Sequence, residues 1–252
     1  MVNLSKQATL EYLFPETSKW LALQNGLRAF PGSGYILVTA ASSLLTVNSG
    51  IFGGGINHRR YFINRQVEKD YTSDCPADEM ADYLASQFAS YKPAAKSEWA
   101  ALMTAARVVD ACWLKVTHQD CQVNVIITAG VNNACSAGVT PYCVSASGKV
   151  GPGTINTMAF INRALTPGAL VNAVQTMTEA KTQTLRELNI TCPVTGAFAS
   201  GTNTDATLIA AAADTIPCEY TGPGTLIGYM LALGVRGALT QAVKSYLEAG
   251  SY

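Results

Sequence analysis

The apolar residues of this chain fall into short runs with two different spacings. A run rich in β-branched residues, "GYILVTAASSLLTVNSGIF" at 34–52, is typical of a strand, and glycines punctuate its end. The segment 107–131 predicts a pair of strands around a polar turn at Gln119 and Asp120. Apolar runs at 155–165 and from Ala206 onward predict two further strands.

Three other segments carry apolar residues at helical spacing. The first begins at Pro76, the second follows a capping Thr166 and a first-turn Pro167 and continues to about residue 188, and the third occupies much of 225–248. The chain shows no internal repeat and no long linker. This alternation predicts a single layered domain over residues 1–252, of the α/β or α+β class, with β-sheet covered by helices.

The second predicted helix carries a lysine within its apolar stripe, which consists of Leu170, Val174, Met177, Leu185 and Leu188. Two interpretations of Lys181 are open. Its aliphatic stem packs while its ammonium reaches the edge of the helix, or the ammonium enters a polar pocket, where it pairs with a carboxylate or holds an anionic intermediate. Glu179 lies on the opposite, polar side of the helix, so helix geometry alone predicts that it is solvated.

A dense polar cluster, "SGTNTD" at 200–205, directly precedes the apolar run from Ala206. Turns use these residue types, because glycine tolerates positive φ and short polar side chains bond to their own backbone. A cluster with so many hydrogen-bonding side chains exceeds what a turn needs, and binding sites are often built from loops at strand ends. Both interpretations, a plain turn and a site, stay open at this stage.

Composition excludes several classes of partner. The chain is 48% hydrophobic and 13% charged, with a formal net charge of zero, and it has no basic cluster interleaved with aromatic residues, so we expect no nucleic acid partner. The longest apolar stretch, from Leu226, is interrupted by Gly234, Arg236 and Gly237 and is expected to be too short to span a membrane. The first twenty residues lack the pattern of a signal peptide, so we expect a cytoplasmic location.

Cysteine and histidine usage argues against a structural metal. Seven cysteines are scattered without a CxxC pair, which predicts reduced thiols in the cytosol rather than a disulfide framework or a zinc site. Two histidines, His58 and His118, are too few for a histidine-rich centre. We therefore expect no metal held by the protein itself.

Five segments occur in the order expected for one enzyme family. They are "GGGINHRRYFINRQVEKDYTSDCPADEMADYLA" (53–85), "ITAGVNNA" (127–134), "GTINTMAFINRALTPGALVNAVQTMTEAKTQTLRELNI" (153–190), "SGTNTDATLIA" (200–210) and "YTGPGTLIGYML" (220–231). Together they resemble the adenosylcobinamide amidohydrolase family, often called CbiZ. The resemblance covers most of the chain from about Asn48, and residues 1–33 add little to it.

The resemblance implies hydrolysis of an amide in corrinoid salvage. Members of this family cleave the aminopropanol arm from adenosylcobinamide to give adenosylcobyric acid and aminopropanol, and some act on complete cobamides. A corrinoid is then the expected partner, no separate cofactor is required, and cobalt is present only within the substrate. Since corrinoids carry neutral amide side chains, compact polar residues would suit their recognition.

Catalysis by this route needs an activated water and a proton donor. Asp205 is the predicted carboxylate, because the adjoining apolar strand is expected to give it surroundings that raise its pKa. Lys181 is predicted to support the oxyanion or to pair with Asp205, and Glu179, from the matching "TEAK" motif, is the alternative carboxylate. The residues expected to face the substrate are Asn64, Asp70, Asn132, Asn133, Thr154, Asn156, Thr202, Asn203 and Thr204. Asn132 and Asn133 have a second interpretation as a turn after a strand.

A covalent route is also open. Thr154 follows the glycine-rich "GPG" and is a candidate nucleophile exposed by self-cleavage, although Gly153-Thr154 also suits the entry to a strand. Cys135, beside the asparagine pair, is a second candidate nucleophile, but no neighbouring histidine is evident as its base.

One position departs from the family pattern. Relatives usually carry a histidine where this chain has Gly224. His58 and His118 are the candidates to substitute for it, and nothing in the sequence places either one nearby. This departure keeps a second function open, a non-catalytic corrinoid-binding protein. A third is an amidase for an unrelated small amide.

Overall fold

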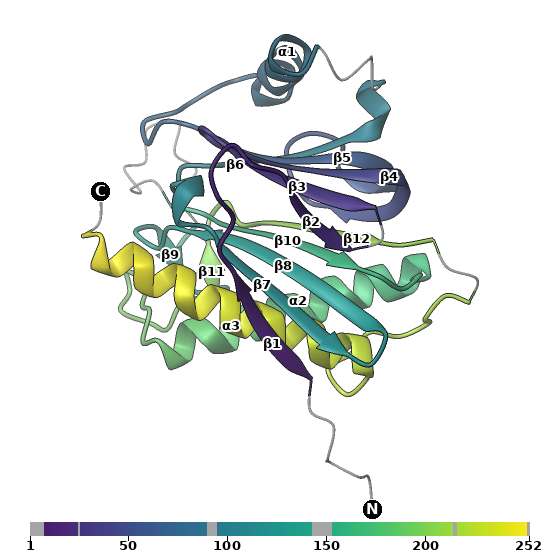
Figure 1. Ribbon diagram of the computed structural model, residues 1–252. Coiled ribbons are helices and arrows are strands. Elements are labelled where there is room, and N and C mark those ends of the chain that lie inside the picture. Colours follow the sequence, from purple (N-terminus) through teal and green to yellow (C-terminus); the bar gives the residue numbers. More distant parts are fainter. Residues whose placement is uncertain (1–7, 25, 90–94, 143–152, 214–215, 251–252) are drawn as a thin grey trace, which may run out of the picture.

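The computed structural model describes residues 8–24, 26–89, 95–142, 153–213 and 216–250. These residues form a large curled sheet, a small two-stranded sheet and three helices (Figure 1). The strands are β1 Thr9–Leu13, β2 Leu21–Gln24, β3 Leu27–Gly32, β4 Tyr35–Asn48, β5 Gly55–Gln66, β6 Trp99–Thr104, β7 Cys112–His118, β8 Cys121–Ala129, β9 Ala134–Cys135, β10 Ile155–Ile161, β11 Gly201–Thr202 and β12 Ala206–Ala211. The helices are α1 Pro76–Gln87, α2 Pro167–Glu187 and α3 Leu226–Glu248.

The sheet curls because β4 takes part in two layers. Its order is β1-β7-β8-β10-β12-β4-β3-β2, and β5 pairs with both β4 and β6. The first half of β4 pairs with β3, whereas its last residues, Leu45–Asn48, pair with β12. The register of β4 against β5 shifts between Thr39 and Leu44, as in a β-bulge, which bends a strand.

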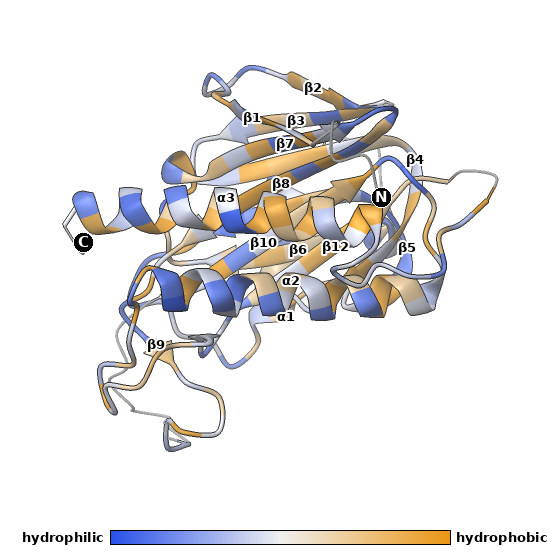
Figure 2. Cartoon of the chain, turned by 90° about the horizontal axis from the view of Figure 1, so that it is seen from below, coloured by the Kyte–Doolittle hydropathy of each residue, from blue (hydrophilic) through white to orange (hydrophobic). Residues whose placement is uncertain are grey.

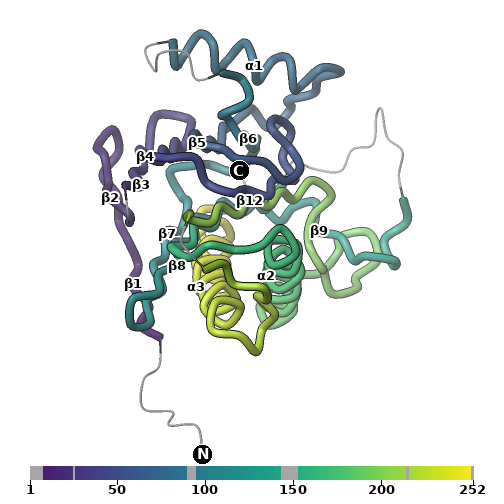
Figure 3. Tube along the Cα trace, turned by 90° about the vertical axis from the view of Figure 1, so that its right-hand side faces the viewer, coloured from purple at the N-terminus to yellow at the C-terminus, as the bar shows by residue number. Residues whose placement is uncertain are grey.

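Helices cover both outer faces, so the molecule has four layers (Figure 3). Met80, Leu84 and Phe88 of the α1 region pack on the β5-β6 side. Figure 2 shows α2 and α3 across the face of the sheet that contains β8, β10 and β12. A second core lies between the two sheet layers, where the rings of Phe62 and Phe160 meet at 5.3 Å in an edge-on arrangement.

The predicted fold class and elements are largely confirmed. Thr166 caps α2 by accepting a hydrogen bond from the Ala169 N–H at 3.1 Å, and Thr225 caps α3 in the same way through the Gly228 N–H. The predicted turn at Gln119 joins β7 to β8, with φ of 54° at Gln119. The predicted strand pair begins later than expected, because residues 108–110 form a short 3-10 turn. The segment "SASGKVGPGT" at 145–154 has the composition of a loop, and most of it lies outside the described residues.

The expectation that the apolar stretch from Leu226 is too short for a membrane span is wrong. The helix continues to Glu248 and, by length and composition, is apolar enough to cross a membrane. Its packing gives another reason for its apolar character, since Leu231 and Leu239 are fully buried and α3 packs on β7, β8 and α2. Gly234 permits this close approach, because a Cβ there would lie 2.8 Å from the Val125 side chain.

The contact between the sheet layers gives a test of the fold. Phe160→Ala removes a fully buried ring and is expected to lower the free energy of unfolding by about 3–5 kcal/mol, because the surrounding side chains cannot close the cavity. Urea denaturation measures the change. Phe14→Ala is the control, since this ring is 89% exposed, and an equal loss in both variants would contradict the assignment of Phe160 to the core.

Candidate active site

Three of the sequence motifs meet at one edge of the sheet. β8 ends at Ala129, and the antiparallel β10 begins beside it, with Ile155 opposite Ala129. β12 runs parallel to β10 and begins next to it, with Asn156 opposite Ala206. The loop after β8, the entry to β10 and the 200–205 cluster before β12 therefore lie together, although they are far apart in the sequence.

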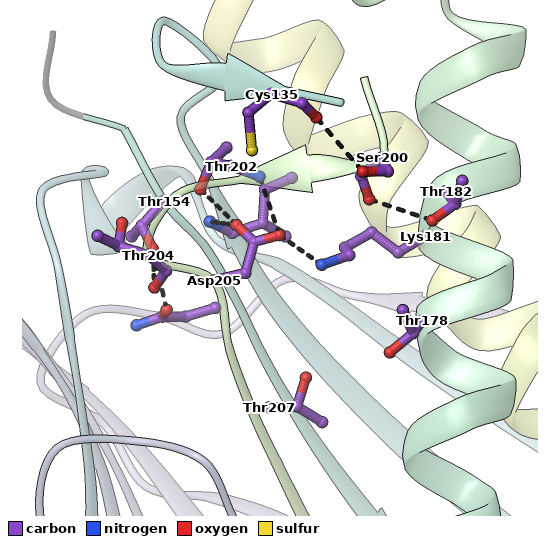
Figure 4. A network of polar contacts seen from close by, with 12 residues as sticks. Cys135, Thr154, Thr178, Lys181, Thr182, Ser200, Thr202, Thr204, Asp205 and Thr207 are labelled. Atoms are coloured by element: carbon purple, nitrogen blue, oxygen red, sulfur yellow. Dashed lines mark hydrogen bonds and ion pairs between the residues drawn. The ribbon is translucent and has the colours of Figure 1, made fainter. Parts of the chain in front are cut away.

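Lys181 and Asp205 form an ion pair at this edge (Figure 4). Lys181 reaches the carboxylate from α2, and Asp205 belongs to the loop that leads into β12. The two side chains are only 16% and 12% exposed. The pairing of Lys181 with Asp205, one of the two interpretations drawn from its place in the apolar stripe, is confirmed.

The Asp205 carboxylate has a polar environment, which corrects the expectation of apolar surroundings. Besides Lys181, it accepts hydrogen bonds from the Thr202 N–H at 3.1 Å, from the Thr202 hydroxyl and from the Ile155 N–H at 3.0 Å. Gly201 makes room for it, because a Cβ at that position would lie 2.4 Å from Asp205 Oδ2. These four donors use the lone pairs of the carboxylate, so Asp205 holds neighbouring groups in place.

The polar cluster at 200–205 is more than a turn. The Ser200 N–H donates to the Cys135 carbonyl at 2.8 Å, and the pairing of β9 with β11 holds the loop after β8 against the cluster. Thr202 bonds to Asp205, and Thr204 bonds to the entry of β10. Asn203 is exposed. The cluster therefore joins three segments of the chain at the site.

The carbonyl of Gly153 accepts two side-chain hydrogen bonds. One comes from Asn133 Nδ2 at 2.6 Å and the other from Thr204 Oγ1 at 3.0 Å. The next residue, Thr154, is 3% exposed, and its hydroxyl donates to the Thr204 carbonyl at 2.8 Å. The buried Asn133 Oδ1 has no hydrogen-bond partner among the described residues. Sequence reasoning named the side chains here but had no signal for the carbonyl on which they converge.

Asn64 and Asn156 lie deeper, in a buried network that joins the two sheet layers. Asn156 Nδ2 donates to Asn64 Oδ1 at 2.9 Å and to the Met103 carbonyl at 2.8 Å. Asn64 Nδ2 donates to Thr128 Oγ1 at 3.0 Å. Each asparagine is 1% exposed, so their donors and acceptors serve the protein itself in this structure. Thr128 was not among the predicted site residues.

The other predicted site residues lie apart from the ion pair. Glu179 is exposed on the outer side of α2, as its helical position predicted. Asp70 is exposed beside a shallow hollow lined in part by Arg65 and Tyr71. Asn132 is exposed, next to the buried Asn133.

A cleft gives access to this edge of the sheet. Its lining includes Gly130 and Gly153, the side chains of Lys69 and Arg107, and Tyr246 near the end of α3. Burial raises the pKa of the Tyr246 phenol, so this group is uncharged at neutral pH. The cleft reaches the same Gly153 whose carbonyl carries the two side-chain donors.

Cys135 is not activated as a nucleophile. Burial, followed by the negative charge of Asp205, raises the pKa of the Cys135 thiol. A thiol with a raised pKa stays protonated at neutral pH, and the thiolate is the reactive form. The structure therefore disfavours the covalent route through Cys135.

Gly224 lies away from Tyr246 and the cleft, and both histidines lie away from this edge of the sheet. α3 starts two residues after Gly224 and rises about 1.5 Å per residue, so Gly224 and Tyr246 are roughly 30 Å apart. His118 ends β7 at the opposite edge, and His58 pairs with Leu45, which in turn pairs with Ala211 at the end of β12. Neither histidine replaces a missing group at the Lys181–Asp205 site.

The partly buried Lys181–Asp205 pair gives a test of its contribution to stability. Lys181→Met keeps much of the stem but leaves a carboxylate without its cation, so the free energy of unfolding is expected to fall by on the order of 3 kcal/mol. Lys115→Met is the control, because the Lys115–Glu11 pair is more exposed and is expected to contribute less than about 1 kcal/mol. In a double-mutant cycle, Asp205→Asn should offset much of the loss in Lys181→Met, and strict additivity would contradict the coupling.

Comparison with known proteins gives one family match and several weaker likenesses. An uncharacterized protein of Methanocaldococcus jannaschii is 36% identical over 101 residues, which is 38% of this chain and 39% of that protein. The chain thus aligns with about two fifths of that relative. The PH0078 protein of Pyrococcus horikoshii has a TM-score of 0.45 at 10% identity, covering 95% of this chain and 84% of the other. A β-aminopeptidase of Burkholderia sp. also has a TM-score of 0.45, at 9% identity, covering 94% and 84%.

The two structural likenesses are too weak to bear on function. The family model described as adenosylcobinamide amidohydrolase matches residues 23–251, nearly the whole length. The matched range contains the Lys181–Asp205 pair, the Gly153 carbonyl with its donors, and all three segments that form this edge of the sheet. The chain belongs to the adenosylcobinamide amidohydrolase family.

Proposed function

We propose that this protein hydrolyses the aminopropanol amide of adenosylcobinamide, or of a related cobamide, to give adenosylcobyric acid. The observation that carries the proposal is the partly buried Lys181–Asp205 pair, next to a carbonyl held by two side-chain donors, in a chain of this family. The substrate is a corrinoid, and its cobalt belongs to it rather than to the protein.

The groups at the site suit the charge that develops in amide hydrolysis. Attack on an amide carbonyl creates an oxyanion, which prearranged donors stabilise. Asn133 Nδ2 and Thr204 Oγ1 are such donors, and the Lys181 ammonium supplies positive charge nearby. Asp205 holds Lys181 in position through their ion pair. The unpartnered Asn133 Oδ1 is an acceptor suited to the N–H of a substrate amide.

The cleft supports a pose in which only the arm of the corrinoid enters the site. Gly130 and Gly153 leave its floor without side chains, so an extended aminopropanol amide can approach the backbone there. Asn132 and Asn203, both exposed, suit the neutral amide side chains of the corrin ring, which would stay outside. A buried arm and an exposed ring would explain why some of the predicted substrate-facing residues, such as Asn133, are buried and others, such as Asn132 and Asn203, are exposed.

The activity is tested by incubating the purified protein with adenosylcobinamide in the dark and identifying products by chromatography and mass spectrometry. We expect adenosylcobyric acid and aminopropanol. Lys181→Met is expected to lower kcat roughly 100-fold, the typical effect of losing one oxyanion-stabilising group, while corrinoid binding, followed by the visible spectrum, persists. Cys135→Ala should keep kcat unchanged.

Each other outcome identifies a different function. Tight corrinoid binding without product would point to a carrier or to another corrinoid substrate. The absence of any corrinoid binding would overturn the proposal and favour an amidase for a different small amide. Full activity in Lys181→Met would remove the ammonium from the mechanism.

The departure at Gly224 is tested by restoring the residue of its relatives. A Cβ at Gly224 has no atom within 4 Å, so Gly224→His is expected to fold normally. Since Gly224 lies roughly 30 Å from Tyr246 by the rise of α3, we expect kcat and KM for adenosylcobinamide to change less than about twofold. A large gain in kcat would show that the histidine acts in the reaction and would contradict the location of the site.

A further inference from the structure

We propose that the chain cleaves its own Gly153–Thr154 peptide bond, and that the freed Thr154 is the N-terminal nucleophile of the amide hydrolysis. The inference rests on the same site as the proposed function and adds the identity of the nucleophile. Its readout is the covalent state of the chain, which needs no corrinoid.

The first observation is the environment of the Gly153 carbonyl. Its oxygen accepts from Asn133 Nδ2 at 2.6 Å and from Thr204 Oγ1 at 3.0 Å. Two side-chain donors on the oxygen of a single peptide bond have the composition of an oxyanion hole, because both stabilise the charge that appears when that carbonyl is attacked. The scissile carbonyl is therefore already polarised in the folded chain.

The second observation is the close packing around the acyl residue. A Cβ on Gly153 would lie 2.3 Å from Asn133 Oδ1 and 2.8 Å from the Gly130 carbonyl oxygen, so only glycine allows this approach. The Asn133 Oδ1 atom is buried and unpartnered among the described residues, in a side chain that is 5% exposed. It is an acceptor beside a bond whose cleavage creates new N–H groups.

The third observation is that Thr154 is fixed on both sides. Its hydroxyl donates to the Thr204 carbonyl at 2.8 Å and lies 3.4 Å from Asn156 Oδ1. The next N–H along the chain, that of Ile155, is held by Asp205 at 3.0 Å. The hydroxyl and the peptide that it would attack are thus held in one geometry.

The reaction is a hydrolysis in two steps. Thr154 Oγ1 bonds to the Gly153 carbonyl carbon, the bond from that carbon to the Thr154 nitrogen breaks, and the hydroxyl proton ends on the nitrogen, which becomes an amine. Water then attacks the resulting ester, and its OH remains on Gly153 as a carboxylic acid, while its hydrogen returns to Oγ1. The net change is the addition of one water across the peptide bond.

The cleaved chain gains the base that the intact site lacks. Asp205 has four donors, and neither described histidine lies at this edge of the sheet. An N-terminal threonine carries its own base, since its α-amine accepts the hydroxyl proton. Departure of the Gly153 carboxylate would also free Asn133 Nδ2 and Thr204 Oγ1 for the carbonyl of the substrate.

Intact-mass spectrometry of the purified full chain, immediately and after incubation, tests the proposal. We expect two polypeptides, residues 1–153 and 154–252, whose masses sum to that of the intact chain plus one water. Thr154→Ala should stay a single chain, and Thr154→Ser should still be cleaved. Asn133→Ala should slow cleavage by roughly 100- to 1000-fold, the effect of losing one oxyanion donor.

The matched control is Thr157→Ala, since Thr157 is a buried threonine of the same strand, 5% exposed, and its variant should be cleaved like the wild type. Circular dichroism checks that Thr154→Ala is folded. Cleavage of Thr154→Ala at the same bond would indicate a contaminating protease and overturn the proposal. An intact wild-type chain, active or inactive on adenosylcobinamide, would also overturn it.

The two proposals fail in different ways. A cleaved chain without turnover of adenosylcobinamide would leave the self-cleavage standing and refute the substrate. An intact chain with turnover would refute the self-cleavage and leave the amidohydrolase proposal in place.

Discussion

The Asp205 carboxylate is the interaction on which the site depends. It takes donors from α2, from the loop before β12 and from the first residue of β10, so one side chain fixes three segments that share no sequence proximity. Burying a charge is costly unless it is paired and hydrogen-bonded. The four donors meet that requirement. Because Asp205 bonds both to Lys181 and to the N–H of Ile155, it also fixes the position of Lys181 relative to Thr154.

The curl of the sheet places a second layer of strands over the inner part of this site. Because β4 bends and serves two layers, β5 and β6 cover the face of β8 and β10 opposite the helices, and Asn64 meets Asn156 between them. A buried amide pair is stable only when its donors and acceptors are satisfied. Thr128 and the Met103 carbonyl satisfy it, so the layer that covers the site is held by specific bonds as well as by apolar packing.

Sequence patterns predicted the elements better than the contacts. The cap at Thr166 and the apolar stripe around Lys181 are local features, so they could be read from residue types alone. The partner of Lys181 could be proposed, because Asp205 stands in the polar cluster directly before the apolar run from Ala206. The role of Gly153 could not be predicted, because a backbone carbonyl is the same in every residue type. Its donors, Asn133 and Thr204, also come from two loops that are distant in the sequence.

The Thr154 hydroxyl is buried, so it can act on a substrate only if the structure around it changes. At 3% exposure, Thr154 cannot meet a substrate in the intact chain, yet the cleft reaches the residue just before it. Cutting that peptide would make Gly153, which lines the cleft, a free chain end that can move away from Thr154. The donors that hold the Gly153 carbonyl belong to the turn between β8 and β9 and to the loop fixed by Asp205. They stay in place after the cut, so a second carbonyl can take the place of the first. The geometry that would cut the chain and the geometry that would hydrolyse a substrate amide are therefore the same.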